Sequence, residues 1–317
     1  MIIYYASQSF YPHIGGVSTY LLNLCSEMVK KGNEVIEVHL RPFGEENIDD
    51  IKGIEIHRVP REPIDKKIMK KYSEFKEAVY KGCHYKNGFT KRAQDMEGFV
   101  EFNNVNEYFG EEIRSLLEQQ PADIVHIHDF QLLFTYKYVP RGTPLILTWH
   151  IPFIETMSKY LADFLIKHMK EYDKVVFSSE DYIKAAVKLG LPKEKAELIY
   201  PIVNTNLFKV LSVNKKDVRK RYGIPEDAKV ILCVQRIDPK SGHEQLIRAF
   251  PKVLEKVPKA KLVFVGEESM SSKLSEDRET LVRQVKQLVK ELKIDKDVIF
   301  TGNIEYNILP ELYNSVG

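Results

Sequence analysis

Short apolar runs, rich in β-branched and aromatic residues, alternate with amphipathic helical patterns over roughly the first 200 residues of the chain. The first run leads into a helical pattern that begins near Gly16. Because such alternation is typical of a parallel sheet with helices on both faces, we expect an α/β fold. The runs predict strands at residues 2–6, 34–39, 54–59, 123–128, 145–149 and 174–177.

A polar segment rich in lysine and aromatic residues interrupts this rhythm between residues 62 and 120. Its pattern is helical. We expect a solvated helical cap here, in preference to a face that touches a membrane or an acceptor.

The pattern restarts after residues 200–208, whose Pro and Asn content is typical of a linker. We therefore expect two domains, residues 1–205 and 206–317. The second domain offers three strand patterns, and its last strand would present a bare edge, so we expect this domain to be incomplete. These strands are expected at residues 230–234, 262–265 and 298–301, with helices at 244–256, 277–292 and 307–314.

Composition narrows the class of protein. A chain of 317 residues that is 44% apolar can bury a large core, and 47 basic against 45 acidic residues leave a net charge of only +2. This balance provides no global field for nucleic acid or an anionic membrane. The three cysteines are widely spaced and fit reduced thiols, and neither a leader nor an apolar run of about 20 residues is present. We expect a cytoplasmic protein without a transmembrane segment or a nucleic-acid partner.

The turn from the first strand to the first helix contains two adjacent glycines, Gly15 and Gly16. Without a Cβ, the backbone can approach a ligand closely, and the first N–H groups of a helix have no intrahelical partner. The turn is therefore a candidate phosphate site. The alternative is a turn that needs glycine only for a positive φ.

A second candidate anion site follows the strand at residues 230–234. Arg236 and Lys240 precede Gly242, at the expected start of the next helix. Ligands of open α/β sheets bind outside the carboxyl ends of the strands, where these cations would meet a helix N-terminus. Arg can hold a diphosphate with two hydrogen bonds, whereas Lys acts as a point charge. Gly266 follows the next strand and is expected at the same edge.

Histidines end two neighbouring strands of the first domain. His128 and His150 are expected side by side near Gly15 and Gly16, whereas we expect His126 to face the opposite side of the sheet in a structural role. Two histidines with a nearby Asp129 fall short of a metal signature, and a neutral imidazole suits a sugar or acceptor hydroxyl better. No Gly-x-Ser-x-Gly elbow or Gly-x-Gly-x-x-Gly fingerprint is present, which argues against a serine hydrolase and a nicotinamide-dependent oxidoreductase.

Taken in order, these motifs resemble the family 4 retaining glycosyltransferases, which have the GT-B fold of two facing Rossmann-like domains. The long segment after Gly266 is also similar to sucrose-phosphate-synthase-like and trehalose-forming members. The motifs that carry the resemblance are Phe10-Tyr11-Pro12 to Gly15-Gly16-Val17, His126-Ile127-His128-Asp129, Thr148-Trp149-His150, Pro201 to Phe208, the Arg236 loop with Leu246-Ile247-Arg248-Ala249-Phe250, and Phe300-Thr301-Gly302-Asn303 with Leu309-Pro310-Glu311-Leu312-Tyr313.

The resemblance implies a hexosyltransferase that moves a sugar from a nucleotide-diphosphate sugar to a hydroxyl on a sugar, a sugar phosphate or another acceptor. It implies retention of configuration and no metal or other cofactor. His150 would contact the donor sugar and Arg236 would stabilise the leaving diphosphate. Donor binding would also involve Gly15, Gly16, Lys240 and Gly266, where the two adjacent glycines would approach either the donor diphosphate or the acceptor. Acceptor binding would involve His128, Asp129 and Trp149.

Two departures from the family pattern stand out. The family commonly has Lys immediately before the glycine of the Arg loop, but Ser241 occupies that position and Lys240 lies one residue earlier. The family also continues into an acidic loop with two glutamates, and the chain ends at Gly317 without it. We therefore expect a C-terminally truncated enzyme. The alternative is a noncatalytic nucleotide- or sugar-binding fragment, or half of a split enzyme.

Overall fold

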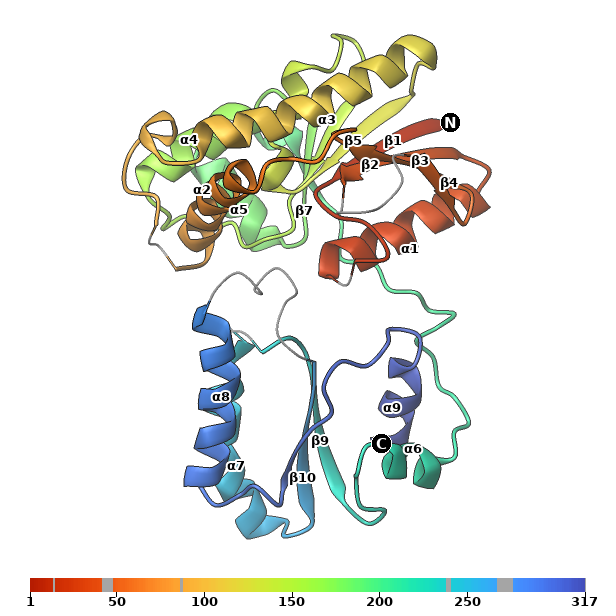
Figure 1. The fold of residues 1–317 in the computed structure, drawn as a ribbon, viewed down its shortest axis with the longest axis vertical. Helices are drawn as coiled ribbons and strands as arrows, with labels where there is room; N and C mark the ends of the chain where they lie inside the picture. The colour runs from red at the N-terminus through yellow and green to blue at the C-terminus, as the bar shows by residue number, and fades with distance from the viewer. Residues whose placement is uncertain (14, 42–47, 86–87, 238–240, 267–275, 317) are drawn as a thin grey trace. The chain divides into compact units, whose positions relative to one another are not determined.

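The computed structural model describes the chain except residues 14, 42–47, 86–87, 238–240, 267–275 and 317, and the side chains of 48 and 276–281. The chain divides into two compact units, Met1–Val203 and Asn204–Gly317, slightly before the expected boundary between residues 205 and 206. Both units are α/β, which confirms the expected fold class (Figure 1). In the described part of the chain, no helix combines the length and apolar character needed to span a membrane.

An eight-stranded sheet forms the centre of the first unit, with the order β3-β4-β2-β1-β5-β6-β7-β8. Every neighbouring pair is parallel except β3 and β4, which are antiparallel. Two edge strands, β3 and β8, were not expected, because they are short and lack an apolar run. The strands are β1 (Ile2–Ser7), β2 (Glu34–Leu40), β3 (Ile48–Ile51), β4 (Ile54–Val59), β5 (Ile124–His128), β6 (Leu145–Thr148), β7 (Lys174–Phe177) and β8 (Ala196–Leu198).

Helices cover both faces of this sheet, and the alternation of β1 shows how. Ile3 and Tyr5 pack in the cluster that contains residues of α1, whereas Tyr4 and Ala6 pack with residues of α2 and α3. Successive side chains of a strand point to opposite faces, so a strand buried on both faces is apolar along its whole length. The helices are α1 (Gly16–Lys30), α2 (Lys66–Tyr85), α3 (Phe99–Gln119), α4 (Lys159–Met169) and α5 (Glu180–Lys188).

The helices α2 and α3 are part of the core. Phe75 of α2 and Phe102 of α3 are fully buried, with ring centroids 4.9 Å apart, and Phe109 lies in the same cluster. The expectation of a solvated cap over residues 62–120 is therefore wrong. Lysines between the apolar positions of α2 made its buried face hard to recognise, although Tyr72, Phe75 and Val79 follow helical spacing.

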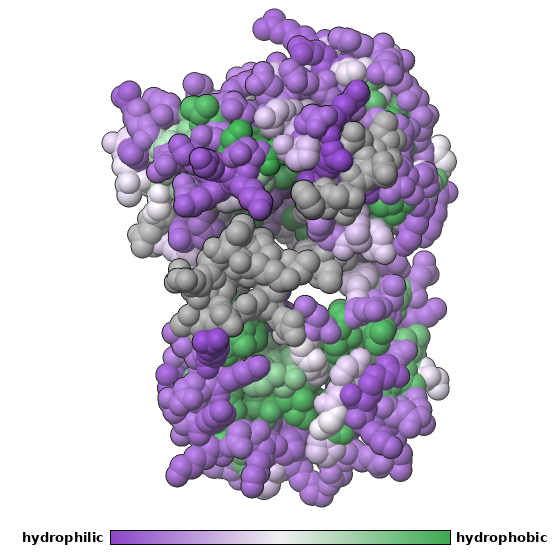
Figure 2. All heavy atoms as spheres, viewed as in Figure 1, coloured by the Kyte–Doolittle hydropathy of each residue, from purple (hydrophilic) through white to green (hydrophobic). Residues whose placement is uncertain are grey.

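The second unit contains a three-stranded parallel sheet of order β11-β10-β9 in the described residues. Its side chains form two buried clusters, one with residues of α7 and α8 and the other with residues of α6 and α9. Hydrophobic side chains are also visible on the face of this unit in Figure 2, and β9 is only half-buried over Val230–Val234. The elements are β9 (Lys229–Val234), β10 (Ala260–Val265), β11 (Val298–Phe300), α6 (Lys215–Arg221), α7 (His243–Lys256), α8 (Glu276–Glu291) and α9 (Leu309–Val316).

Candidate functional site

The glycine turn that leads into α1 does not depend on a left-handed backbone. Gly15 is extended, with φ 179° and ψ 157°, and Gly16 is the first residue of the helix. A Cβ on Gly16 would meet nothing within 4 Å, and one on Gly15 would meet only the Ser18 hydroxyl, at 3.8 Å. The alternative that the turn needs a positive φ is therefore wrong. Open space at the first N–H groups of a helix is suited to close approach by an anion.

Buried polar side chains hold the start of this turn in place. The Ser7 hydroxyl, at the end of β1, lies 2.7 Å from Glu37 Oε1 and 3.0 Å from the carbonyl oxygen of Ser9. Ser18 of α1 donates to the same carbonyl at 3.2 Å. Glu37 Oε2 in turn lies 2.6 Å from His39 Nδ1, and both side chains are fully buried. The backbone at Ser9 is thus fixed from the sheet and from α1.

His128 and His150 form a hydrogen-bonded pair at the carboxyl ends of β5 and β6. The atoms His128 Nδ1 and His150 Nε2 are 2.9 Å apart, which confirms that the two residues lie side by side. Burial lowers the pKa of His150 to about 4 and holds the pKa of His128 well below its usual value. Both rings are therefore neutral at neutral pH.

The surroundings of His128 indicate which ring nitrogen carries the proton in each of the two histidines. His128 Nε2 is buried and has no hydrogen-bond partner among the described residues. A buried N–H without a partner is rarer than a buried acceptor without one, so we assign the proton of His128 to Nδ1, which donates to His150 Nε2. His150 then carries its proton on Nδ1. Because His150 is partly exposed, this N–H is the one that can donate to a ligand.

His126 belongs to the same cluster, so the expectation that it faces the opposite side of the sheet is wrong. Residues two apart on a strand share a face, and the ring centroids of His126 and His128 are 4.2 Å apart. His126 Nε2 lies 2.7 Å from Thr148 Oγ1. Burial lowers the pKa of His126 to about 3, which agrees with the structural role expected for it.

Asp129, the residue directly after His128, supports the backbone of His150. Its Oδ1 accepts the backbone N–H of His150 at 3.2 Å. The residue has φ 69° and ψ 170°, a region that is almost exclusive to glycine and costs roughly 1–3 kcal/mol for other residues. Burial raises the pKa of its carboxyl to about 6. A strained, buried carboxylate next to a partly exposed histidine is typical of a functional site.

The three residues expected on the acceptor side are buried in this structure. Trp149 is fully buried and packs against Phe153, with ring centroids 5.5 Å apart, so its indole is not available to an acceptor. His128 and Asp129 are also buried and contact His150 in place of solvent. We therefore assign both to positioning His150.

Tyr20 is a site residue that the sequence did not reveal. It lies one turn after Gly16 in α1, and its ring centroid is 5.1 Å from that of His150 in an edge-on arrangement. This contact places His150 beside the first turns of α1, close to the glycine turn. Four-residue spacing on a helix would have placed Tyr20 above Gly16, but nothing local in the sequence pairs it with His150.

In the second unit, Arg236 lies in the loop after β9. Its side chain is exposed, while its carbonyl oxygen accepts the Ser241 hydroxyl at 3.0 Å. Gln235 Nε2 donates to the Ser241 carbonyl at 2.6 Å. Ser241, the residue found where the family commonly has Lys, thus helps to close the loop. Lys240 lies outside the described residues.

Gly266 is required by packing against this loop. Its φ is 125°, and a Cβ there would lie 2.5 Å from the carbonyl oxygen of Gln235. Its N–H donates to the carbonyl of Gly302 at 2.9 Å, so the loops after all three described strands meet at one edge. The structure therefore explains Gly266 without a ligand. Gly242, with φ 71°, is the N-cap of α7.

The described residues contain no group of three or more His, Cys, Asp or Glu side chains placed to hold a metal ion. The ring nitrogens of His128 and His150 that face each other are already engaged.

Two glycosyltransferase families match the chain. Residues 99–207 match Glycosyltransferase Family 4, and residues 214–316 match Glycosyl transferases group 1. Among curated proteins, mannosylfructose-phosphate synthase of Agrobacterium fabrum is 22% identical over 95% of this chain and 64% of its own length. An uncharacterized glycosyltransferase of Methanocaldococcus jannaschii is 24% identical over 95% of this chain and 69% of its own length.

Solved structures agree in fold. An E. coli structure described as trehalose-6-phosphate bound with UDP-2-fluoro glucose covers 99% of this chain and 76% of its own, with a TM-score of 0.77 and 15% identity. The structure of sucrose-phosphate synthase from Thermosynechococcus elongatus covers 99% of this chain and 73% of its own, with a TM-score of 0.71 and 16% identity. Residues 99–207 and 214–316 are therefore similar to two glycosyltransferase domains, and the chain has the GT-B fold.

Proposed function

We propose that this protein transfers a hexose from a nucleotide-diphosphate sugar to a sugar or sugar-phosphate hydroxyl, with retention of configuration and without a metal ion. The observation that carries this proposal is the neutral His150, which is held by His128 and Asp129 with one N–H left for a ligand. Relatives named for mannosylfructose-phosphate and sucrose-phosphate synthesis support the substrate class.

Each residue has a chemical task in this scheme. The Nδ1–H of His150 donates to a hydroxyl of the donor sugar and fixes its orientation, since a neutral imidazole adds no charge near the reacting carbon. Arg236 binds the diphosphate with two parallel hydrogen bonds and stabilises the negative charge that develops as the sugar departs. The open helix N-terminus at Gly16 is a further set of donors for a phosphate or hydroxyl oxygen.

A nucleotide-binding protein without transferase activity is the second candidate. It requires only the exposed Arg236 and the helix N-terminus at Gly16 as anion-binding groups, and gives His150 no part in transfer. Binding and transfer therefore have to be measured separately.

The test combines a nucleotide titration with a transfer assay. We expect UDP, GDP or ADP to raise the melting temperature selectively, since a ligand that binds only the native state stabilises it by about 2.7 kcal/mol at 100 times its Kd. The preferred nucleotide sugar is then incubated with glucose 6-phosphate, fructose 6-phosphate and the unphosphorylated sugars, with and without EDTA. NMR of the product reports the anomeric configuration.

A matched pair of variants links the result to the site. Arg236→Ala should abolish the nucleotide-dependent shift, whereas Arg221→Ala, which removes another half-exposed arginine of the same unit, should leave it intact. Nucleotide binding without transfer would favour the second candidate. Loss of transfer in EDTA would refute the metal-independent scheme, and an inverted product would refute retention.

A further inference from the structure

Helix α2 is tied to the carboxyl edge of the first sheet. Lys76 Nζ donates to Gln8 Oε1 at 2.9 Å, and Gln8 is the residue directly after β1. The strand β1 pairs with β5, which ends at His128, the hydrogen-bond partner of His150. The contact between Lys76 and Gln8 therefore lies at the edge of the sheet at which the first unit presents His150.

Lys76 forms no ion pair with the described residues, unlike its neighbours on the helix, although the charge of the adjacent Glu77 acts on it. Lys70 lies 4.0 Å from Glu74 and Lys81 lies 3.5 Å from Glu77, whereas among the described residues no carboxylate is within ion-pair distance of Lys76. Its ammonium group lies 4.5 Å from the centroid of the Tyr72 ring. Burial lowers the pKa of Lys76 to about 8. A partly buried cation without a counter-charge is costly unless an anion joins it.

Two polar groups next to Lys76 keep a donor available. Gln8 uses its carbonyl oxygen to accept from Lys76, which leaves its amide N–H groups, and Gln8 is partly exposed. The Tyr72 hydroxyl is buried and has no partner among the described residues. An ammonium group beside an amide NH2 offers hydrogen-bond donors only, and its positive charge favours an anionic acceptor over a neutral hydroxyl oxygen.

We propose that Lys76 and Gln8 bind the phosphate group of a phosphorylated sugar acceptor. This inference rests on the proposed function and adds the residues that would distinguish a phosphorylated acceptor from a neutral one. The donor's diphosphate is the other possible source of a phosphate, and it is assigned to Arg236 in the second unit. The acceptor is therefore the ligand that this site should serve.

The experiment measures sugar binding to the full chain without a donor. Calorimetry with glucose 6-phosphate and fructose 6-phosphate should show tighter binding than with glucose and fructose. Lys76→Met should lose at least about 10-fold of the affinity for the phosphorylated sugar, which corresponds to about 1.4 kcal/mol. Affinity for the neutral sugars and for UDP should stay within about two-fold, and Lys76→Arg should restore much of the loss.

Two controls separate binding from folding. Lys70→Met removes a lysine of the same helix whose side chain is 79% exposed, and it should leave all affinities unchanged. Because Lys76 is partly buried and forms no ion pair with the described residues, Lys76→Met should melt at the same temperature as the parent chain or higher. If Lys76→Met does not fold, Lys76→Gln takes its place.

The proposal is overturned if the parent chain does not prefer phosphorylated sugars, or if Lys76→Met retains that preference. It is also overturned if Lys76→Met loses UDP binding while sugar-phosphate binding stays intact, since the lysine would then serve the donor. Failure of the proposed function is a different result, in which neither nucleotide binding nor transfer is found in the parent chain.

Discussion

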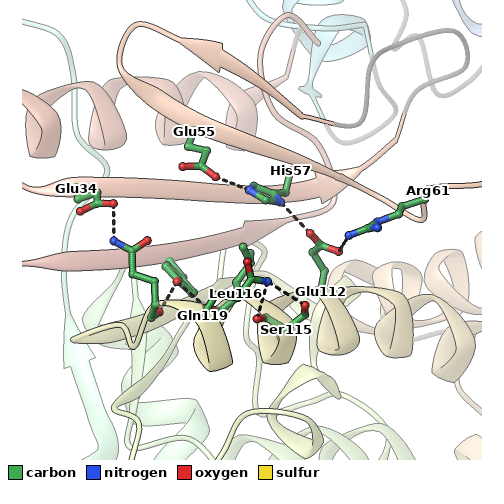
Figure 3. A network of polar contacts seen from close by, with 10 residues as sticks. Glu34, Glu55, His57, Arg61, Glu112, Ser115, Leu116 and Gln119 are labelled. Carbon is green, nitrogen blue, oxygen red and sulfur yellow. Dashed lines mark hydrogen bonds and ion pairs between the residues drawn. The ribbon is translucent and has the colours of Figure 1, made fainter.

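Replacing Glu112 with glutamine should destabilise the Met1–Val203 unit more at about pH 6 than at about pH 9. At the lower pH the parent chain has a charged His57 that pairs with Glu112, whereas at the higher pH His57 is neutral. His57 of β4 lies between two carboxylates, as Figure 3 shows. Its Nδ1 is 2.8 Å from Glu112 of α3, and its Nε2 is 2.7 Å from Glu55 of the same strand. The histidine therefore joins the sheet to the helix that covers it.

The sign of the pH effect follows from the raised pKa of His57 and the lowered pKa of Glu112. Burial lowers the pKa of His57, but hydrogen bonds to Glu112 and Glu55 outweigh it and raise the pKa above its usual value. A raised pKa gives a stabilisation that is complete below the unfolded value of about 6.5 and is lost as the pH rises through the folded value. The bond to His57 lowers the pKa of Glu112, whose contribution is lost as the pH falls below about 4.3.

The loss of stability expected for each substitution depends on how exposed the glutamate side chain is. The Glu112 side chain is 15% exposed and that of Glu55 is 49% exposed. A hydrogen bond to a charged group contributes about 1.5–3 kcal/mol, whereas exposed ion pairs contribute at most about 1 kcal/mol. We therefore expect Glu112→Gln to cost about 2 kcal/mol at the lower pH and less than half of that at the higher pH, with a smaller cost for Glu55→Gln at both.

The chain has a convenient probe for this measurement. Trp149 is its only tryptophan and lies fully buried in the core of the first unit. Urea unfolding followed by Trp149 fluorescence therefore reports the unit that contains His57, even if the two units unfold separately. A loss of stability that is equal at the two pH values would refute the reasoning, as would a larger loss for Glu55→Gln than for Glu112→Gln.

Three further predictions concern the proposed site. Gly266→Ala should lower the free energy of unfolding by about 2 kcal/mol or more, because Gly266 has a positive φ and a Cβ there would approach Gln235. It should also weaken UDP binding. Unchanged affinity in calorimetry would contradict the role of this loop. Arg236→Ala should weaken UDP binding more than Lys240→Ala, because only the guanidinium binds a diphosphate with two parallel hydrogen bonds, and equal losses in a titration would refute this. His150→Ala should lower the transfer rate by about 100-fold or more while the chain still folds, with a modest fall in melting temperature because the buried His128 loses its hydrogen-bond acceptor. Loss of the folded state would make the residue structural.

Much of the fold follows from apolar runs. Strands buried on both faces, such as β1, are continuous in hydrophobicity and are found at the expected positions. The edge strands β3 and β8 were missed because β3 contains Asp49 and Asp50 and β8 has only three residues. Edge strands need little apolar surface, so their sequences resemble loops.

The candidate site was predictable only where adjacency follows from topology. His128 and His150 end neighbouring parallel strands, so their pairing could be expected from strand order. Trp149 was expected at the acceptor, but its side chain points away from that of His150 and into the core, since neighbouring residues alternate in direction. The contact between Lys76 and Gln8 joins residues 68 apart in sequence, and no local pattern encodes it.

The backbone of Asp129 has a consequence for attempts to stabilise this protein. Glycine is the residue that best tolerates φ 69° and ψ 170°, so Asp129→Gly relieves roughly 1–3 kcal/mol of backbone strain, and a selection for thermal stability would favour it wherever this relief exceeds the loss of the buried hydrogen bond to His150. That relief is a substantial part of the 5–15 kcal/mol by which native proteins are typically stable. The same change removes the carboxylate that accepts the His150 N–H. Thermostability and activity should therefore oppose each other at this one position, which makes residue 129 a place to leave untouched during engineering.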